Sequence, residues 1–380
     1  GWLRPILTAS HQLILVMHDR DEGHHPLSTQ LQSSFENFTE VRVEDALLAS
    51  DGGQIVSALD VPTEPLPLRP LPRSRRWWQL PADCPISAPQ SESYKRLEQL
   101  IYHPHEWVLD RAARLREGRT ADLSRDNLLY GNLAHRLIER FFATSPDWAR
   151  RNDGALREWF AEFVPLLIRQ EGALLCRPGH GVAHERVVAI LENALTRLLS
   201  HLRSAHIESA IAEAPGETPL EDTRLNGRID LLLRDHRGHE VVLDVKWGGQ
   251  DYKAADLAAN RHLQLATYAY LRHAVTGVWP DLAYYIASTG VVLARDTSVF
   301  PHALAVQSTA IEPTDALWAR VTRTYAWRRS QIAAGRIEVT ATGTEPDGDD
   351  PLPPADLLET HGRPDRFDPF TALTGWEDGV

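Results

Sequence analysis

The chain has 380 residues, a formal net charge of −12 at pH 7 and only two cysteines, Cys84 and Cys176. Two cysteines exclude a disulfide framework, a four-cysteine zinc site and an all-cysteine iron–sulfur cluster within this chain. The negative charge disfavours a stand-alone, tight, non-specific DNA binder, and no apolar run approaches the ~18–20 residues that span a bilayer. We therefore expect a soluble, cytoplasmic protein with no membrane segment.

The first ninety residues differ in composition from the remainder. Residues 12–17, which read Gln-Leu-Ile-Leu-Val-Met, are typical of a single strand, and one strand cannot form a stable sheet alone. Prolines recur throughout residues 61–90, which favours an extended linker with Trp77 and Trp78 as an apolar anchor. We expect a partial domain over residues 1–60, followed by this linker.

Residues 91–210 are predicted to be mainly helical. Apolar side chains recur at helical spacing from Tyr94 to about residue 109, and Pro104 is expected to break or restart that segment. Three further helices are predicted at residues 128–142, 153–171 and 182–207.

The pattern then changes to strands. Residues 225–233 and 240–247 flank a short turn that contains glycine, and this arrangement predicts an antiparallel hairpin. The remaining elements are predicted, in order, as a helix at 254–275, strands at 282–287 and 290–295, and a helix at 313–334. The last forty residues, 341–380, are rich in Pro, Asp, Gly and Thr and predict loops.

The hairpin carries the most informative polar residues. Asp230 lies in its first strand, and Asp244 and Lys246 share one face of the second because side chains alternate along a strand. Carboxylates within apolar strands are costly to bury unpaired. A magnesium ion would hold them, since it binds oxygen ligands such as two carboxylates and a backbone carbonyl, here that of Val245. A buried Asp–Lys ion pair is the alternative, and the spacing alone leaves both open.

Two helices carry further pairs of polar residues. His135 and Glu139 lie four residues apart and share a helix face, and Gly131, one turn earlier, would permit close helix packing. Gln264 and Tyr268 share a face in the same way. Taken alone, the first pair is more simply explained as a surface or core contact, and the second as a half-buried polar face.

The order of these motifs resembles the PD-(D/E)XK nuclease superfamily. The matching motifs are Gly131-x-x-x-His135, Gly227-Arg228-Ile229-Asp230, Asp244-Val245-Lys246 and Gln264-x-x-x-Tyr268. Each motif is weak singly, but four in this order are specific, and they look most like the RecB-type branch found at the C-terminal end of bacterial helicase–nuclease subunits such as AddB. The resemblance covers residues 75–335. It implies an α/β, restriction-endonuclease-like core over residues 91–340, in which helices flank a mixed central sheet, with a large helical insertion or N-terminal helical part.

The resemblance also implies a role for each motif residue. The metal ligands would be His135, Asp230, Asp244 and the carbonyl of Val245. The catalytic set would be Asp230, Asp244, Lys246, Gln264 and Tyr268. The nucleic-acid contacts would be Arg228, Arg261, Gln264 and Tyr268. Glu139 matches a recurrent acidic position, and Glu213 looks like an acid in the outer shell of the site.

The implied activity is hydrolysis of DNA phosphodiester bonds with Mg²⁺ or Mn²⁺, without sequence specificity, on single strands or duplex ends. An exonuclease is favoured over an endonuclease, with a role in DNA repair, recombination or phage defence. Many relatives carry Cys-Pro, the start of a four-cysteine iron–sulfur cluster, where this chain has His103-Pro104. We therefore expect no cluster, and packing must join the two ends of the nuclease fold.

The N-terminal segment resembles the last piece of a UvrD-type helicase-like domain, on the strand at 12–17 and on His25-Pro26-Leu27. A phosphate-binding Gly-Lys-Thr loop is missing from the sequence, so no ATP hydrolysis is expected. A helicase or another protein partner is expected. The alternative function is a non-cleaving DNA-binding or assembly module of a helicase–nuclease complex, which the intact Asp–Asp–Lys set disfavours. A site-specific restriction enzyme would need a base-reading element, and we identify none.

Overall fold

The computed structural model describes residues 33–34, 76–115, 126–307, 312–340, 354–359 and 369–374. The chain divides into two compact units, Gly1–Pro70 and Leu71–Val380. The second unit carries all of the elements named below. The strand predicted at residues 12–17 and the motif at 25–27 lie outside the described residues, as does most of the loop-rich tail predicted at 341–380.

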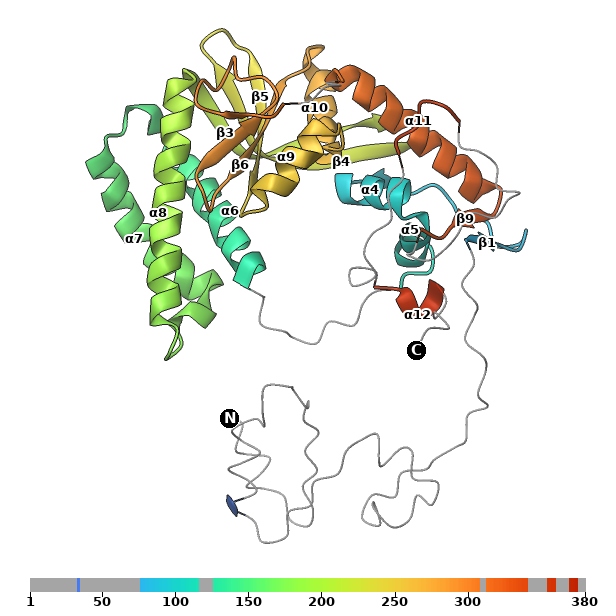
Figure 1. Cartoon of the computed structure of the whole chain (residues 1–380), viewed down its shortest axis with the longest axis horizontal. Coiled ribbons are helices and arrows are strands. Elements are labelled where there is room, and N and C mark those ends of the chain that lie inside the picture. Colours follow the sequence, from blue (N-terminus) through green and yellow to red (C-terminus); the bar gives the residue numbers. More distant parts are fainter. Residues whose placement is uncertain are drawn as a thin grey trace. The chain divides into compact units, whose positions relative to one another are not determined.

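A mixed seven-stranded sheet forms the centre of the second unit (Figure 1). Six strands follow the order β2-β4-β5-β6-β7-β8. The seventh strand, β3, lies off this path and pairs with β4. Neighbouring strands are antiparallel in the pairs β3–β4, β4–β5 and β6–β7, and parallel in β2–β4, β5–β6 and β7–β8. The strands span Ser91–Glu92 (β2), Ile207–Leu220 (β3), Thr223–Asp235 (β4), Glu240–Lys246 (β5), Asp281–Ile286 (β6), Val291–Ala294 (β7) and Leu304–Ala305 (β8).

The hairpin of β4 and β5 confirms the prediction from the alternating pattern. The strand β5 is buried from Glu240 to Val245 and rich in Val and Leu, which suits a central strand covered on both faces. The carboxylate of Asp235 accepts hydrogen bonds from the backbone N–H groups of Arg237 and His239 at 2.8 and 2.9 Å. Gly238 has a φ of +81°, which closes the turn.

Helices cover both faces of this sheet and bury a separate apolar core on each (Figure 1). The first face packs against α6 (Asp126–Thr144), α7 (Asp153–Glu171) and α8 (Gly181–Ser204). The second face packs against α4 (Tyr94–Tyr102), α5 (Pro104–Arg111), α9 (Gln250–Ala258), α10 (Leu263–Thr276) and α11 (Thr314–Ala333). This arrangement confirms the predicted α/β fold class with a mixed central sheet, and α6–α8 supply the large helical part.

Packing joins the two ends of the nuclease unit. The short strands β1 (Trp77–Gln79) and β9 (Arg336–Glu338) pair in antiparallel fashion. The fully buried guanidinium of Arg328 pairs with Glu338 and donates a hydrogen bond to the carbonyl of Ile101 at 3.1 Å. The Nδ1 of His103 lies 3.1 Å from the hydroxyl of Thr340.

Three elements differ from the sequence prediction. The helix predicted at 182–207 ends at Ser204, and residues 207–220 form the long strand β3. The helix predicted at 254–275 is two helices, because Asn260 has a φ of +54° and the N–H of Arg261 bonds back to the carbonyl of Asp256. Trp77 and Trp78, expected in an extended linker, pair with β9 as a strand.

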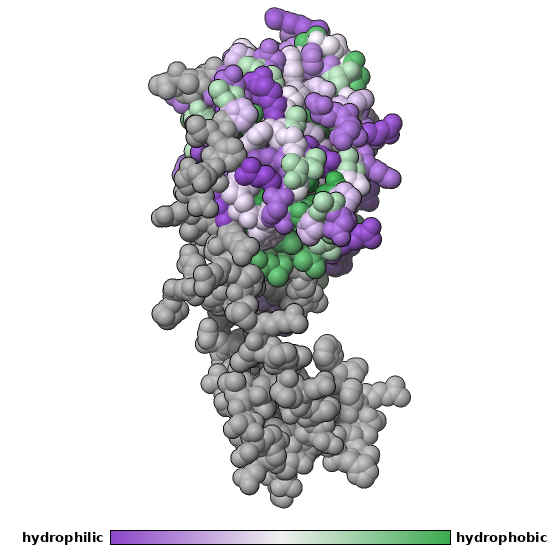
Figure 2. All heavy atoms as spheres, turned by 90° about the vertical axis from the view of Figure 1, so that its right-hand side faces the viewer, coloured by the Kyte–Doolittle hydropathy of each residue, from purple (hydrophilic) through white to green (hydrophobic). Residues whose placement is uncertain are grey.

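The surface of the described residues is mostly polar. Figure 2 shows hydrophilic side chains over much of one face, together with a smaller hydrophobic patch. Large exposed apolar or aromatic side chains include Val182, Tyr252 and Val275, which lie on three different helices. Among the residues that the structure describes, the helices are too short or too polar to cross a bilayer.

Candidate active site

The candidate site lies where β4 and β5 separate. Their pairing ends at Leu231 and Leu243, next to Asp230 and Asp244. Beyond that point the backbone N–H of Val245 donates a hydrogen bond to Oδ2 of Asp230 at 2.8 Å. Because this bond takes the place of a bond between strand backbones, it fixes the Asp230 carboxylate in the fork between the two strands.

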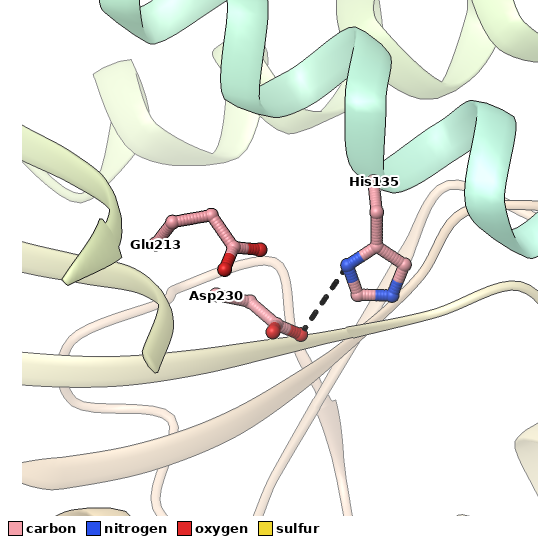
Figure 3. Close-up of side chains that lie close together, drawn as sticks. All are labelled: His135, Glu213 and Asp230. Atoms are coloured by element: carbon pink, nitrogen blue, oxygen red, sulfur yellow. Dashed lines mark ion pairs between the residues drawn. The ribbon is translucent and has the colours of Figure 1, made fainter. Parts of the chain in front are cut away.

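The helix α6 brings His135 to this fork. Its Nδ1 lies 3.7 Å from Oδ2 of Asp230, as Figure 3 shows. The sequence also predicted that Gly131 would permit close packing of this helix. A Cβ at that position would lie 3.7 Å from Cβ of Trp247, which is an ordinary contact, so the packing does not require glycine.

Glu213 of β3 joins His135 and Asp230 in a group of three. One ligand atom from each residue lies within 4.8 Å of the other two, and both carboxylates point toward the imidazole (Figure 3). Glu213 has a φ of +52°, and the strand alternation breaks there: Ala212 packs against the core under α6–α8, whereas Ala214 packs in the other core. From the sequence, Glu213 is predicted only as an acid in the outer shell of the site.

Asp244 and Lys246 form the second part of the site. The Asp244 side chain is 0% exposed, and the Nζ of Lys246 lies 2.5 Å from its Oδ2. Apart from this contact, neither carboxylate oxygen of Asp244 has a hydrogen-bond partner among the described residues, so the ion pair with Lys246 is its main compensation for burial. Val245, between them, points into the opposite core as the alternation predicted.

Burial shifts the protonation of all three clustered ligand candidates toward their neutral forms. Burial, followed by the charge of Asp244, raises the pKa of Asp230 to about 8, although the charge of Lys246 opposes the shift. Burial also raises the pKa of Glu213, with an added contribution from Glu139. Burial and the charge of Lys246 lower the pKa of His135, so its imidazole stays neutral and able to bind a metal.

The helix α10 places Gln264 and Tyr268 beside the fork. The amide Nε2 of Gln264 donates to the Tyr268 hydroxyl at 3.3 Å, and burial raises the pKa of this hydroxyl. Gly227 of β4 lies under the same helix. A Cβ on Gly227 would lie 2.9 Å from Cδ1 of Leu271 and 3.1 Å from Cε1 of Tyr268. The glycine of this motif therefore lets α10 approach the sheet.

The two arginines named as nucleic-acid contacts occupy different places. The guanidinium of Arg228 is 3.9 Å from Oε2 of Glu213 and its side chain is 70% exposed, so it lies at the rim of the acidic group. Arg261 lies 3.8 Å from Asp256 and lines an adjoining pocket that also contains Lys246. Glu139, which matches a recurrent acidic position of the motif, pairs with Arg136 at 2.7 Å.

The donors suit a hard divalent cation. Carboxylate oxygens and a neutral imidazole are suitable ligands, and a cation would offset the buried charges of Asp230 and Asp244. The structure brings His135, Asp230, Asp244 and Lys246 to one fork. It differs from the expected ligand set in one respect, because Glu213 clusters with His135 and Asp230 while Asp244 is oriented toward Lys246.

Sequence comparison identifies the family. The profile of the PD-(D/E)XK nuclease superfamily matches residues 91–366, and the chain belongs to this superfamily. A search of curated proteins found no significant match. Superfamily membership implies metal-dependent nuclease activity, DNA binding and a restriction-endonuclease-like fold, and the mixed sheet with its two helical layers agrees with that fold.

Proposed function

We propose that this protein is a deoxyribonuclease of the RecB/AddB type that depends on Mg²⁺ or Mn²⁺. One observation carries the proposal: the Asp230 carboxylate sits in the fork of β4 and β5, next to His135 and close to the Asp244–Lys246 pair. The superfamily match supports the class of reaction, and the order of the motifs supports the branch.

The residues divide the chemistry among them. His135, Glu213 and Asp230 would hold the metal ion, with Asp244 and the carbonyl of Val245 as further ligands. When bound, the ion would lower the pKa of a water molecule and offset charge on the scissile phosphate. Lys246 places a positive charge where negative charge grows during hydrolysis.

A second group of residues orients the DNA strand. Gln264 and Tyr268 share a hydrogen bond on α10 beside the fork, and they would hydrogen-bond to the backbone of the strand. Arg228, exposed at the rim, would bind a neighbouring phosphate. Contacts of this kind carry no sequence information, so we propose cleavage without sequence specificity.

We further propose that the protein acts on single strands or duplex ends, as an exonuclease rather than an endonuclease, in DNA repair, recombination or phage defence in the cytoplasm. Residues 1–60 would be a helicase-like segment and 61–90 its linker, without ATP hydrolysis. The net charge of −12 supports a helicase or another protein partner that contributes affinity for DNA.

A non-cleaving DNA-binding or assembly module is the second candidate. The observation that favours it is the contact between Lys246 and Asp244, which would be a structural ion pair in a protein without catalysis. In that case, removal of either partner would change the stability of the protein, and there would be no cleavage rate to change.

A cleavage assay on the full chain separates the two candidates. The substrates are linear single-stranded DNA, linear duplex DNA and circular DNA, each incubated with Mg²⁺, Mn²⁺ or EDTA. Asp244→Asn is the test variant, and Glu185→Gln, an exposed acid on α8, is the matched control. We expect metal-dependent cleavage of linear DNA by the wild-type protein and by the control, and a loss of about 100-fold or more in Asp244→Asn. Absence of cleavage with either ion would overturn the proposal.

A further inference from the structure

A polar pocket of about 180 Å³ opens beside Lys246. Its walls come from α4, α9, α10, β5 and β6 and include Lys246, Tyr252, Lys253, Asp256, Arg261 and Gln264. Lys246 and Gln264 belong both to this pocket and to the candidate active site. The pocket therefore begins next to the position proposed for the scissile phosphate.

The charges in the pocket favour an anion. The Nζ of Lys253 lies 3.2 Å from Oδ2 of Asp256, and the Nε of Arg261 lies 3.8 Å from Oδ1 of the same carboxylate. One carboxylate thus positions two cations without neutralising both. Within this group of three, one positive charge is in excess. Lys246 and Glu98 also line the pocket, and Lys246 already pairs with Asp244. A phosphate group fits between the two cations that share Asp256.

Tyr252 presents an aromatic ring at the same pocket. Its side chain is 64% exposed, and the Nζ of Lys253 lies 5.0 Å from the centre of its ring. Every nucleobase has a flat face that can stack on such a ring. A base inside an intact duplex already stacks on its neighbours, so only an unpaired nucleotide can reach the tyrosine.

The size of the pocket limits what it can hold. Pockets that enclose a whole small-molecule ligand measure about 300–1,000 Å³. At about 180 Å³ this pocket is smaller, and it suits part of a longer ligand rather than a separate small molecule. One nucleotide of a DNA strand, held by its base and its phosphate, satisfies the size, the charge and the exposed ring.

We propose that this pocket binds the unpaired nucleotide next to the scissile phosphate, with its base stacked on Tyr252 and its phosphate between Lys253 and Arg261. The inference rests on the proposed function, because it specifies the substrate of the same site. It makes Tyr252 and Lys253 positioning residues, and it restricts cleavage to single strands and frayed ends.

Steady-state kinetics on a single-stranded oligonucleotide test the role of Tyr252. Tyr252→Ala is expected to raise KM by about 5- to 150-fold, the factor that corresponds to loss of one base–aromatic stack, with a smaller effect on kcat. Tyr252→Phe keeps the ring and is expected to restore the wild-type KM. Val182→Ala, an exposed apolar residue on α8, is the control and should leave both constants unchanged. A KM that Tyr252→Ala does not change would overturn the proposal.

Two further measurements exclude a merely structural effect. Abasic sites in the oligonucleotide should raise the KM of the wild-type protein by about as much as Tyr252→Ala does on the normal oligonucleotide. The same abasic sites should raise the KM of Tyr252→Ala only a little further, because both changes remove one stacking contact. If the effects of the abasic sites and of Tyr252→Ala on KM simply add, the stacking role is overturned.

Lys253→Ala should reduce the slope of log KM against log salt by about one, and an unchanged slope would overturn the phosphate contact. A wild-type protein that cleaves no DNA with either ion would overturn the nuclease assignment and this inference together, whereas unaltered kinetics in an active enzyme would overturn only the pocket.

Discussion

Replacement of Asp230 by asparagine should abolish cleavage and yet stabilise the protein in the absence of metal. The carboxylate of Asp230 lies in the fork between β4 and β5, where burial and the charge of Asp244 raise its pKa. The amide oxygen of asparagine can still accept the hydrogen bond from the N–H of Val245. The variant therefore keeps the local geometry and removes a charge that the fold disfavours.

The size of this effect follows from the pKa. Burial, together with the charge of Asp244, raises the pKa of Asp230 from its usual value of 3.8 to about 8. Below 3.8 the carboxyl is protonated in the folded and unfolded states, so the charge costs nothing. Between pH 3.8 and about 8 the Asp230 carboxyl is ionised in the unfolded state but still protonated in the folded state. A rise in pH over this range therefore lowers the stability of the folded protein. A difference of about 4 pH units sets an upper limit of about 6 kcal/mol, and burial of the amide reduces the expected gain to about 3 kcal/mol.

Urea unfolding in EDTA at about pH 5 and about pH 8.5 measures this gain. The free energy of unfolding of Asp230→Asn should exceed that of the wild-type protein mainly at the higher pH, while Glu185→Gln should follow the wild type at both. Mg²⁺ should stabilise the wild-type protein and have little effect on Asp230→Asn, since a bound ion and a neutral side chain relieve the same burial of charge. Equal differences at the two pH values, or a variant less stable than wild type at about pH 8.5, would refute the reasoning.

Four further predictions concern the same site. Lys246→Ala should lower the cleavage rate by about 10²–10³-fold, and it should lower the free energy of unfolding by about 3–5 kcal/mol because Asp244 loses its buried partner. The double variant Lys246→Ala/Asp244→Asn should recover the stability but not the activity. A double variant that is no more stable than Lys246→Ala in urea unfolding would contradict this explanation. Gly227→Ala should cost about 1–3 kcal/mol in the same assay, since its Cβ would clash with α10, and an unchanged midpoint would refute the close approach. Glu213→Gln should weaken Mg²⁺ binding about tenfold or more by calorimetry, and equal affinity would remove this residue from the ligand set. The cleavage rate should rise between about pH 6 and about pH 8.5 as the buried carboxylates lose protons, and a flat profile would contradict their role.

The parts of the fold with a regular local pattern could be predicted from the sequence. The helix α7 spans the predicted residues 153–171, and its start is fixed by Asn152, whose side chain accepts a hydrogen bond from the N–H of Ala155. The strands β4 and β5 also lie close to their predicted bounds. In both cases the periodicity of apolar residues and the residues at the ends of the element point to one structure.

The strand β3 could not be predicted in the same way. Its sequence contains Pro215 and Pro219 and several alanines, which are poor strand formers. It forms because it pairs along almost its whole length with β4, and prolines are tolerated at the edge of a sheet. The two strands form a hairpin in which Leu220 pairs with Thr223, and its turn, Glu221-Asp222, lacks the Asn-Gly or Asp-Gly pair that usually signals a hairpin.

The candidate site shows the same division. Alternation along β5 placed Asp244 and Lys246 on one face, and the structure has them in contact. The approach of Glu213 to Asp230 depends on a left-handed residue within β3 and on the register between two strands. No spacing in the sequence encodes those two features. The sequence therefore could not predict that Glu213, rather than Asp244, clusters with His135 and Asp230.

The central claim is that a divalent cation binds in the fork of β4 and β5, and anomalous diffraction from a crystal of the full chain soaked in Mn²⁺ tests it most directly. We predict a peak in contact with the side chains of His135, Glu213 and Asp230, and no such peak in crystals of Asp230→Asn. Crystals of the wild-type protein with no peak in the fork at saturating Mn²⁺, or with ions only elsewhere on the surface, would contradict the account.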